Sequence, residues 1–469
     1  MASWVNFSAF LPLLLAIIAY FYISNKNNLD FLQRVANGLL KEESSVNVTK
    51  DLKVAVGFGS CMDLIVDGIP LLKKLKIKPP AQPAHHDSIG NEKDLAEVFM
   101  YFMREGAAAE RFTDPATFEK ILKTAKTLPN VIWRAGGNAP IIGKRLSLEG
   151  ASQVLIASNA SSDYRSFFPD NVKFLGEADH QDDVHLILEF KVGDKWGSYI
   201  APRANRFVIH SDANNPKLRY IEPFGTAIKS FNPDLVIVSA LQMLDNYPFQ
   251  NNERDQRMQT LQDFLESIDN MPVHFEMASF SEKAMMKSLL KYVVPFVTSI
   301  GMNEQKLPNL VSMLKYGDIV TVSDANPRTA RVLDSMRALY SEMQEKSLRG
   351  LERIHVHTLA FQAILTKKSS KWKNSQACVA KAALVANRYI CNKEEIDTSK
   401  AKILMDESFA ASLAEDSKRI PFNPDHPVSC WDERDYEICI APVLVCTEIY
   451  QTVGGGDNIS PAGFLLQLS

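Results

Sequence analysis

The chain has 469 residues, with 52 Lys and Arg against 55 Asp and Glu and a formal net charge of -3. Because proteins that bind nucleic acid usually carry a basic surface, this balance argues against a general nucleic-acid binder. A hydrophobic fraction of 46% with 23% charged residues is typical of a globular protein and excludes wholesale disorder. At about 150 residues per domain, the length allows two or three domains.

The first 25 residues contain no Asp, Glu, Lys or Arg. Within them, residues 4–23 are almost wholly apolar and long enough to cross a bilayer as a helix. A secretory signal peptide is one interpretation, although the positive n-region is missing. An uncleaved anchor is the other, and the basic residues that follow it would then leave the body cytosolic. Either way we expect residues 1–25 to target the secretory pathway at the endoplasmic reticulum and to make the protein's only membrane contact.

The six cysteines contain no CxxC pair and therefore give no support to a structural zinc site or a thioredoxin-like motif. Cys61 and Cys378 are isolated, whereas four lie in the last fifth of the chain: Cys391, Cys430, Cys439 and Cys446. We interpret all six as buried free thiols, with a disulfide in the C-terminal group as the alternative. Asn47 and Asn159 stand in glycosylation sequons, which are used only if the body is lumenal.

From about residue 52 the pattern alternates between short apolar runs and segments with helical spacing. The runs predict buried strands at 53–59, 153–158, 185–190, 235–241, 272–277 and 354–361. Helices are predicted at Asp94–Glu105, Asp255–Ile268 and Ala330–Glu345. Such alternation implies parallel pairing in an open, doubly wound sheet.

Residues 185–224 break this rhythm with several strands and few helical positions. Turn residues at Gly193-Asp194 and at 214–216 separate the predicted strands, the last of which is LRYIEPF at 218–224. A β-meander inside an α/β chain predicts a lid or a small second lobe. Since no linker separates the two parts, we expect interwoven domains.

The strongest chemical signal is the sequence GGGDNISPAG near the C-terminus. Gly454, Gly455 and Gly456 let backbone N–H groups converge on an anion, and Ser460-Pro461 predicts a helix start. An Asp in this place would repel a phosphate bound as that anion, so Asp457 suits a structural role poorly. It makes sense as a base for a hydroxyl that attacks the phosphate.

Other polar residues follow predicted strands, where ligands gather in such sheets. Glu276 and Glu304 are carboxylates suited to Mg²⁺, held directly or through water. A glycine turn at Gly136-Gly137 precedes Asn138, whose amide could bond sugar hydroxyls, and Asp63 follows the first strand. Gly143-Lys144 lacks the earlier glycine of a P-loop, and no protein-kinase motif is present.

Six of these motifs, in order over about residues 53–468, resemble the ADP-dependent glucokinases of the ribokinase-like superfamily. They are GSCMD, GGNA, HLILEF, HFE, GMNEQ and GGGDNISPAG, and the membrane-targeted animal branch is the most similar. The resemblance implies a Rossmann-like large domain with a smaller β-containing lid, the kinase unit spanning 52–469 and the lid about 62–120 and 180–225. It also implies a monomer that binds ADP and D-glucose and makes glucose 6-phosphate and AMP with Mg²⁺, the first step of glycolysis.

The resemblance also implies roles for individual residues. Asp457 would be the catalytic base, near the metal, and the three glycines before it would form an anion hole. Glu276 and Glu304 match the magnesium-linked carboxylates. The sugar pocket would be lined by Asp63, Gly136, Gly137, Asn138 and His185.

One departure from the family pattern, the role of two arginines and two alternative functions stay open. Archaeal members often carry Asn where this chain has Cys61, which leaves sugar specificity open, including activity on fructose 6-phosphate. Arg203 and Arg206 could hold phosphate or be solvated charges on the lid. An ATP-dependent or other-sugar kinase of the same superfamily is the main alternative function. A non-catalytic sensor is the other, and the intact GGGD sequence argues against it.

Overall fold

The computed structural model describes residues 26–48, 51–178, 181–245, 247–278, 280, 282–319, 327–406, 408–451 and 453–469. The predicted signal peptide or anchor at 1–25 lies outside these residues. No helix within the described ranges is long and apolar enough to span a bilayer.

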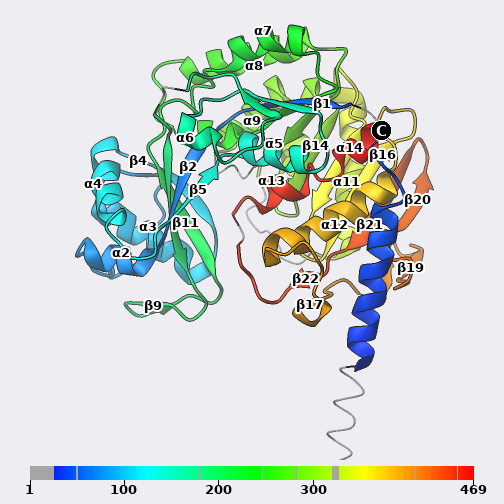
Figure 1. Ribbon diagram of the computed structural model, residues 1–469, viewed down its shortest axis with the longest axis horizontal. Helices are drawn as coiled ribbons and strands as arrows, with labels where there is room; N and C mark the ends of the chain where they lie inside the picture. Colours follow the sequence, from blue (N-terminus) through cyan, green and yellow to red (C-terminus); the bar gives the residue numbers. More distant parts are fainter. Residues whose placement is uncertain are drawn as a thin grey trace, which may run out of the picture.

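The large domain is built on a ten-stranded sheet with the order β20-β21-β16-β15-β14-β13-β12-β1-β6-β7 (Figure 1). Its parallel part comprises β1 (Lys53–Gly57), β6 (Gln153–Ile156), β7 (Val172–Phe174), β12 (Leu235–Val238), β13 (Val273–Glu276), β14 (Ser299–Asn303) and β15 (Arg353–His357). An antiparallel edge follows, with β16 (Phe361–Lys367), β21 (Tyr436–Pro442) and β20 (Ser429–Glu433). The predicted open parallel sheet is confirmed, and it carries an antiparallel extension.

The central strands are apolar throughout because both faces of the sheet are covered. In β1, Ala55 packs into one core cluster, while Val54 and Val56 pack into another on the opposite face. The first cluster lies under α7 (Ile221–Phe231), α8 (Glu253–Ser267), α9 (Lys283–Tyr292), α10 (Lys306–Tyr316) and α11 (Thr329–Lys346). The opposite face is covered by α5 (Asn138–Leu148), α12 (Ser375–Cys391) and α14 (Phe464–Leu468). A sheet buried on both faces needs continuous hydrophobic runs, which explains the sequence pattern.

A second, six-stranded sheet forms the smaller domain, with the order β3-β4-β11-β8-β2-β5. Its strands are β2 (Cys61–Asp67), β3 (Ser88–Ile89), β4 (Ala109–Thr113), β5 (Ile132–Gly136), β8 (Val184–Phe190) and β11 (Asn205–His210). One face packs against α2 (Gly68–Lys74), α3 (Glu92–Glu105) and α4 (Pro115–Ala125) in a core of its own. A short hairpin of β9 (Lys195–Trp196) and β10 (Tyr199–Ile200) joins β8 to β11. The predicted lid ranges hold most of this sheet, and β5 lies between them.

Two strand predictions are wrong. LRYIEPF at 218–224 is a turn that enters α7, because Pro223 falls in the first helical turn, where no backbone N–H donor is needed. The run at 354–361, predicted as one strand, holds most of β15, a turn at 358–360 and the first residue of β16. Thr358 turns the chain there, since its Oγ1 accepts from the N–H groups of Ala360 and Phe361 at 3.1 and 2.9 Å.

The interpretation of all six cysteines as free thiols is wrong for the C-terminal four. Disulfides join Cys391 to Cys446 and Cys430 to Cys439. The second follows from strand register, which places Cys430 of β20 directly opposite Cys439 of β21. Cys61 and Cys378 are free and buried.

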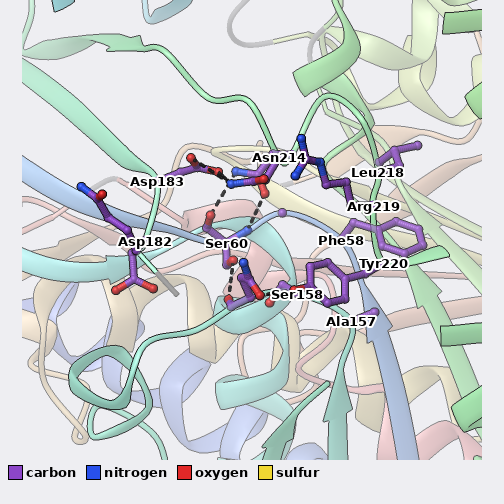
Figure 2. A pocket seen from close by; sticks show the side chains of 14 residues that line it. Phe58, Ser60, Ala157, Ser158, Asp182, Asp183, Asn214, Leu218, Arg219 and Tyr220 are labelled. Atoms are coloured by element: carbon purple, nitrogen blue, oxygen red, sulfur yellow. Dashed lines mark hydrogen bonds between the residues drawn. The ribbon is translucent and has the colours of Figure 1, made fainter. Parts of the chain in front are cut away.

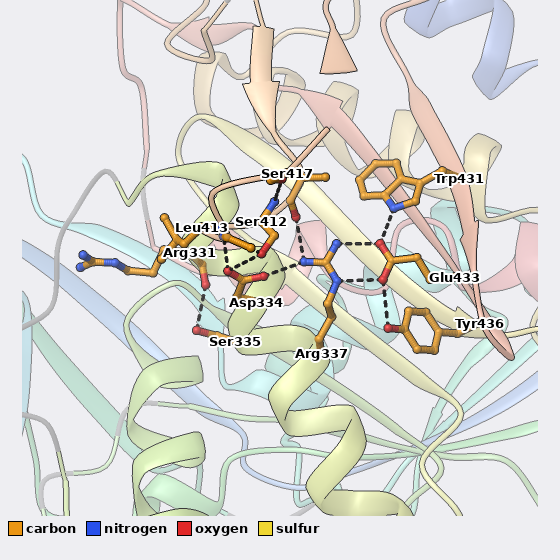
Figure 3. Close-up of polar contacts among 12 residues, drawn as sticks. Arg331, Asp334, Ser335, Arg337, Ser412, Leu413, Ser417, Trp431, Glu433 and Tyr436 are labelled. Atoms are coloured by element: carbon orange, nitrogen blue, oxygen red, sulfur yellow. Dashed lines mark hydrogen bonds and ion pairs between the residues drawn. The ribbon is translucent and has the colours of Figure 1, made fainter. Parts of the chain in front are cut away.

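An ion-pair cluster ties α11 to the antiparallel edge of the large sheet (Figure 3). The Arg337 guanidinium donates to both carboxylate oxygens of Glu433, at 2.8 and 2.7 Å, and to Asp334 at 2.8 Å. Trp431 and Tyr436 donate to the same Glu433 carboxylate. Hydrogen bonds from Arg337, ahead of the others, lower the pKa of Glu433 to about 2. Two charged groups thereby fix the position of a long helix against two strands.

Candidate active site

A cavity of about 200 Å³ lies where the small sheet faces the large domain. Strand alternation places its lid-side lining on one face of the small sheet. Neighbours in register, such as Asp63 with His185 and Val208 with Ile187, point into it together. The large domain contributes segments that follow its strands or precede its helices, with Asn138, Gln242 and Asp457 among them. The cavity is therefore formed by both domains.

Asp457 stands in the first turn of α13 (Gly455–Ile459). Gly454 precedes this helix with a φ of 71°, which favours glycine, and so lets the chain enter the helix at the glycines. The predicted helix start at Ser460-Pro461 is wrong, since Ser460 follows the helix as its C-cap. The backbone N–H groups of the first helical turn have no partners within the helix. The three glycines and Asp457 therefore lie at the positive end of a helix.

The Asp457 carboxylate is held by a short chain of amides. The Nδ2 of Asn138 donates to Oδ1 and Oδ2 of Asp457, at 2.9 and 3.1 Å. The Nε2 of Gln242 donates in turn to Oδ1 of Asn138 at 2.9 Å. Burial raises the pKa of Asp457 to about 7, and the nearby Glu276 carboxylate adds to this rise, whereas the Asn138 amide opposes it. A carboxyl group with this pKa can accept a proton near neutral pH.

Glu276 ends β13 and is enclosed by two histidines. Its Oε2 lies 3.1 Å from His274 Nε2, and its Oε1 lies 3.2 Å from His357 Nε2. Burial alone would raise the pKa of Glu276, but hydrogen bonds from the two imidazoles hold it well below its usual range. The carboxylate also lies against the backbone of Gly301, where a Cβ would come within 2.2 Å of Oε2. Glu276 is therefore ionised at neutral pH.

The donor chemistry around Glu276 fits a hydrated magnesium ion. The half-buried Lys306 interacts electrostatically with three carboxylates, those of Glu276, Asp457 and Glu304. The oxygen atoms of these three carboxylates do not all lie within 4.8 Å of one another. Within the described ranges, the buried Ser460 Oγ beside Glu276 has no hydrogen-bond partner. Because Mg²⁺ keeps several waters and needs few protein ligands, this spaced set suits water-mediated binding.

On the lid side, Asp63 and His185 lie next to each other on β2 and β8. His185 Nε2 lies 2.8 Å from Asp212 Oδ2. Burial alone would lower the pKa of His185, but the Asp212 carboxylate raises it well above its usual value. Burial raises the pKa of Asp63 to about 6.

The glycine turn at Gly136-Gly137 is required by its surroundings. A Cβ on Gly136 would lie 2.2 Å from Asp63 Oδ1, and one on Gly137 would lie 2.5 Å from the Gly59 carbonyl oxygen. The φ of Gly137 is also 88°. The turn thus brings Asn138 to the cavity while leaving room for Asp63.

Most of the predicted site residues line one cavity, among them Asp457, Asp63, Gly137, Asn138 and His185, whereas Gly136, Glu276 and Glu304 do not line it. Other residues there were not singled out by the sequence. Glu110 and Gln242 line the cavity, and His357 reaches Glu276 from β15. The alternation of side chains along β4 gives a weak indication that Glu110 faces the cavity. No local sequence pattern indicates a site role for Gln242. Of the two lid arginines, Arg206 lines the cavity, and the exposed Arg203 packs beside Gly106.

A second, smaller pocket lies where the chain crosses between the domains (Figure 2). Ser60 exchanges two hydrogen bonds with the Asn215 side chain, at 3.2 and 3.0 Å, and its Oγ donates to the Asn159 carbonyl at 2.8 Å. Asn214 donates to the Asp183 carboxylate at 3.4 Å. These bonds join the segment between β1 and β2 to the segment between β11 and α7. Both segments connect the large domain with the small one, so the bonds hold the two connections together.

A mostly parallel α/β sheet covered by helices, with a smaller β-sheet domain beside it, is the arrangement of the ribokinase-like fold. The predicted fold class is confirmed by solved structures. An ADP-dependent kinase in complex with fructose 6-phosphate and ADPβS has a TM-score of 0.64 at 20% identity, covering 94% of this chain and 98% of that one. A last common ancestor of ADP-dependent phosphofructokinases from Methanosarcinales has a TM-score of 0.58 at 20% identity, with the same coverage.

The family model described as the ADP-specific phosphofructokinase/glucokinase conserved region matches residues 52–466. The ADP-dependent glucokinase of Bos taurus is 34% identical over 418 residues, which cover 88% of this chain and 83% of that protein. A probable ADP-dependent glucokinase of Caenorhabditis elegans is 26% identical over 431 residues, covering 88% and 84%. The chain belongs to the ADP-specific phosphofructokinase/glucokinase family, as its motifs indicated.

Proposed function

We propose that the protein transfers the terminal phosphoryl group of ADP to the 6-hydroxyl of D-glucose, giving glucose 6-phosphate and AMP. This is the first step of glycolysis. The observation that carries the proposal is Asp457, a carboxyl group with a pKa near 7 at the start of α13, in a cavity shared with Asp63 and His185. The likeness to the Bos taurus glucokinase, which exceeds that to the phosphofructokinases at about 22%, supports glucose as acceptor.

In the proposed reaction, Asp457 accepts the proton of the sugar hydroxyl while that oxygen attacks the β-phosphorus of ADP. The bond from this phosphorus to the bridging oxygen breaks, and AMP leaves. Negative charge develops on the transferred phosphoryl group, where the N–H groups of the first turn of α13 stabilise it. Asn138 keeps the carboxylate of Asp457 in one orientation.

Magnesium belongs to the proposal as a cofactor. Glu276 and Glu304 would hold it through water, with Asp457 nearby, and the ion would neutralise charge on the diphosphate. This assignment is supported by the oxygen donors and by the unpartnered Ser460 hydroxyl beside them.

The test is to measure glucose 6-phosphate formation by the protein from residue 26 onward. ADP with Mg²⁺ and glucose should support turnover, while ATP should be much poorer. Fructose 6-phosphate in place of glucose tests the acceptor. Equal or better turnover with ATP would overturn the donor assignment, and preference for fructose 6-phosphate would overturn the acceptor assignment.

We further propose that the body is a monomer in the lumen of the endoplasmic reticulum, reached through residues 1–25. The two disulfides support the lumenal placement, because disulfides persist mainly in oxidising compartments. In microsomes, the exposed Asn47 should accept a glycan, whereas the half-buried Asn159 should not, since Tyr220 donates to its side chain. Asn47→Gln should then abolish a glycosidase-sensitive gel shift that Asn159→Gln leaves intact. A full-length protein that is accessible to protease in sealed microsomes would contradict the lumenal placement.

A further inference from the structure

Three residues of different ligand types meet on the cavity face of the lid. Cys61 and Asp63 are two residues apart on β2, and His185 is the register partner of Asp63 on β8. Their ligand atoms, one thiol sulfur, one carboxylate oxygen and one imidazole nitrogen, all lie within 4.8 Å of one another. All three side chains are buried, and all three line the cavity.

The spacing between the thiol and the carboxylate is close to that of two ligands in a tetrahedral zinc site. Zinc binds thiolate sulfur at about 2.3 Å and carboxylate oxygen at about 2.0–2.2 Å, so a tetrahedral angle separates these ligands by about 3.5 Å. The Cys61 thiol donates to Asp63 Oδ1 at 3.3 Å, so the two ligand atoms already lie at this spacing, and zinc would take the place of the thiol proton. Because the three residues line the cavity, an ion bound to them would be open to it, as in zinc sites that keep one position open.

The orientation of His185 suits a metal ligand. Its Nε2 lies 2.8 Å from Asp212 Oδ2, and its Nδ1 pairs with Glu110 Oε1 at 3.3 Å, a contact that zinc on Nδ1 would replace. A carboxylate bonded to the far nitrogen of a ligating histidine is the usual support around zinc. His210 and Asp212 form a second group with His185, but neither lines the cavity. The group with Cys61 is the one that an entering ion meets.

Cys61 is one of only two thiols, since the other four cysteines form disulfides. The second, Cys378, packs in the core between α12 and the large sheet. We propose that Cys61, Asp63 and His185 bind a zinc ion, and that this ion and the sugar exclude each other from the cavity. The exclusion rests on the proposed function, whereas the metal site does not.

Binding replaces two protons with the metal ion, one from the Cys61 thiol and one from His185 Nδ1, and both are released to solvent. Thiolate and imidazole ligands favour zinc over magnesium, which prefers oxygen. The site is therefore separate in chemistry from the carboxylates around Lys306.

Direct binding is measured with Zn²⁺ by calorimetry and with Co²⁺ by absorption, on untagged protein from residue 26 onward without substrates. We expect one equivalent of Zn²⁺ and a thiolate-to-cobalt charge-transfer band. Cys61→Ser should abolish the band and weaken Zn²⁺ binding at least tenfold, while the matched control Cys378→Ser keeps both. Asp212→Asn should weaken binding by about 10–100-fold. A band that survives in Cys61→Ser, or no binding by folded protein, would overturn the site.

Competition is measured by repeating the Zn²⁺ titration with glucose present, and by glucose 6-phosphate formation at constant ADP and Mg²⁺. We expect glucose to weaken Zn²⁺ binding and Zn²⁺ to raise the KM for glucose without lowering kcat. Zinc binding that glucose does not alter would overturn the mutual exclusion and leave the metal site standing. Glucose phosphorylation by a protein that binds no zinc would overturn the zinc site and leave the kinase function standing.

Discussion

The carboxyl group of Asp457 changes charge near neutral pH, because burial raises its pKa to about 7. As a base it works only when ionised, so kcat/KM should rise with pH through about 7 and level off above it. Asp457→Asn should lower kcat by about 10²–10⁴-fold, the usual contribution of a general base. Glucose 6-phosphate formation between pH 5.5 and 8.5 measures both effects. A pH profile that is flat across this range would contradict the assignment.

A measurement of stability shows whether Asp457→Asn loses activity because the base is gone or because the protein misfolds. Since the folded-state pKa of Asp457 is above its unfolded value of 3.8, the folded protein binds this proton more tightly. The group therefore destabilises the fold progressively as pH rises from about 4 to 7. Asp457→Asn should thus melt at the same temperature as the parent at pH 8, or higher.

Asn138 is a second residue with a measurable effect, through its two hydrogen bonds to Asp457. These bonds favour the charged carboxylate and lower its pKa. Asn138→Ala should therefore move the midpoint of the pH–rate profile upward and lower kcat. A purely structural role would lower activity without moving the midpoint, which a profile at saturating ADP and glucose distinguishes.

The residues of the candidate site differ in how well the sequence alone predicts them. Asp457 could be predicted because three glycines precede it and only one chemical role suits an acid there. His357 could not, because its meeting with Glu276 depends on β14 separating β13 from β15 and on side-chain orientation. The alternation of β2 places Cys61 and Asp63 on one face, but the register with β8 is what adds His185.

At the scale of elements, the start of α13 tests how the glycines act. Gly454 has a φ of 71°, a conformation that costs other residues about 1–2 kcal/mol. A Cβ on Gly456 would lie 3.2 Å from His357 Cε1, whereas one on Gly455 would lie 3.7 Å from Ile390, an ordinary contact. Substitution by Ala should lower kcat most at Gly454 and least at Gly455, measured in three single variants at a temperature well below the melting temperature of each. The reverse order would contradict this account of the turn.

Elements buried on both sides were predicted well because burial leaves a continuous apolar run. Predictions failed where side-chain type and backbone geometry gave different signals. Ser460-Pro461 has the composition of a helix start, yet the positive φ of Gly454 begins the helix six residues earlier. LRYIEPF has the residues of a strand, yet Pro223 suits the first turn of a helix.

Over the whole molecule, ion pairs connect the N-terminal helix at residues 26–43 with the start of α13. Glu43 lies 3.6 Å from Lys381 of α12, whose Nζ lies 2.6 Å from Glu149. Glu149 pairs with Arg145 at 3.1 Å, and Arg145 donates to Asn458, the neighbour of Asp457, at 3.1 Å. Because four segments far apart in sequence contribute, no local pattern could predict this connection. The helix at residues 26–43 is thus joined to the large domain by charge.

The same helix (Figure 1, blue) is also part of the core, and this gives a prediction for the whole fold. Leu39 is fully buried with α12 and β21, whereas its neighbour Leu40 is 36% exposed. Leu39→Ala should lower the free energy of unfolding by about 2–5 kcal/mol, the usual cost of a cavity in a core. Leu40→Ala, the matched control with the same change in helix propensity, should lower it far less. Chemical denaturation of both variants in the protein from residue 26 onward measures the difference, and equal losses would mean that the helix is not packed as a core element.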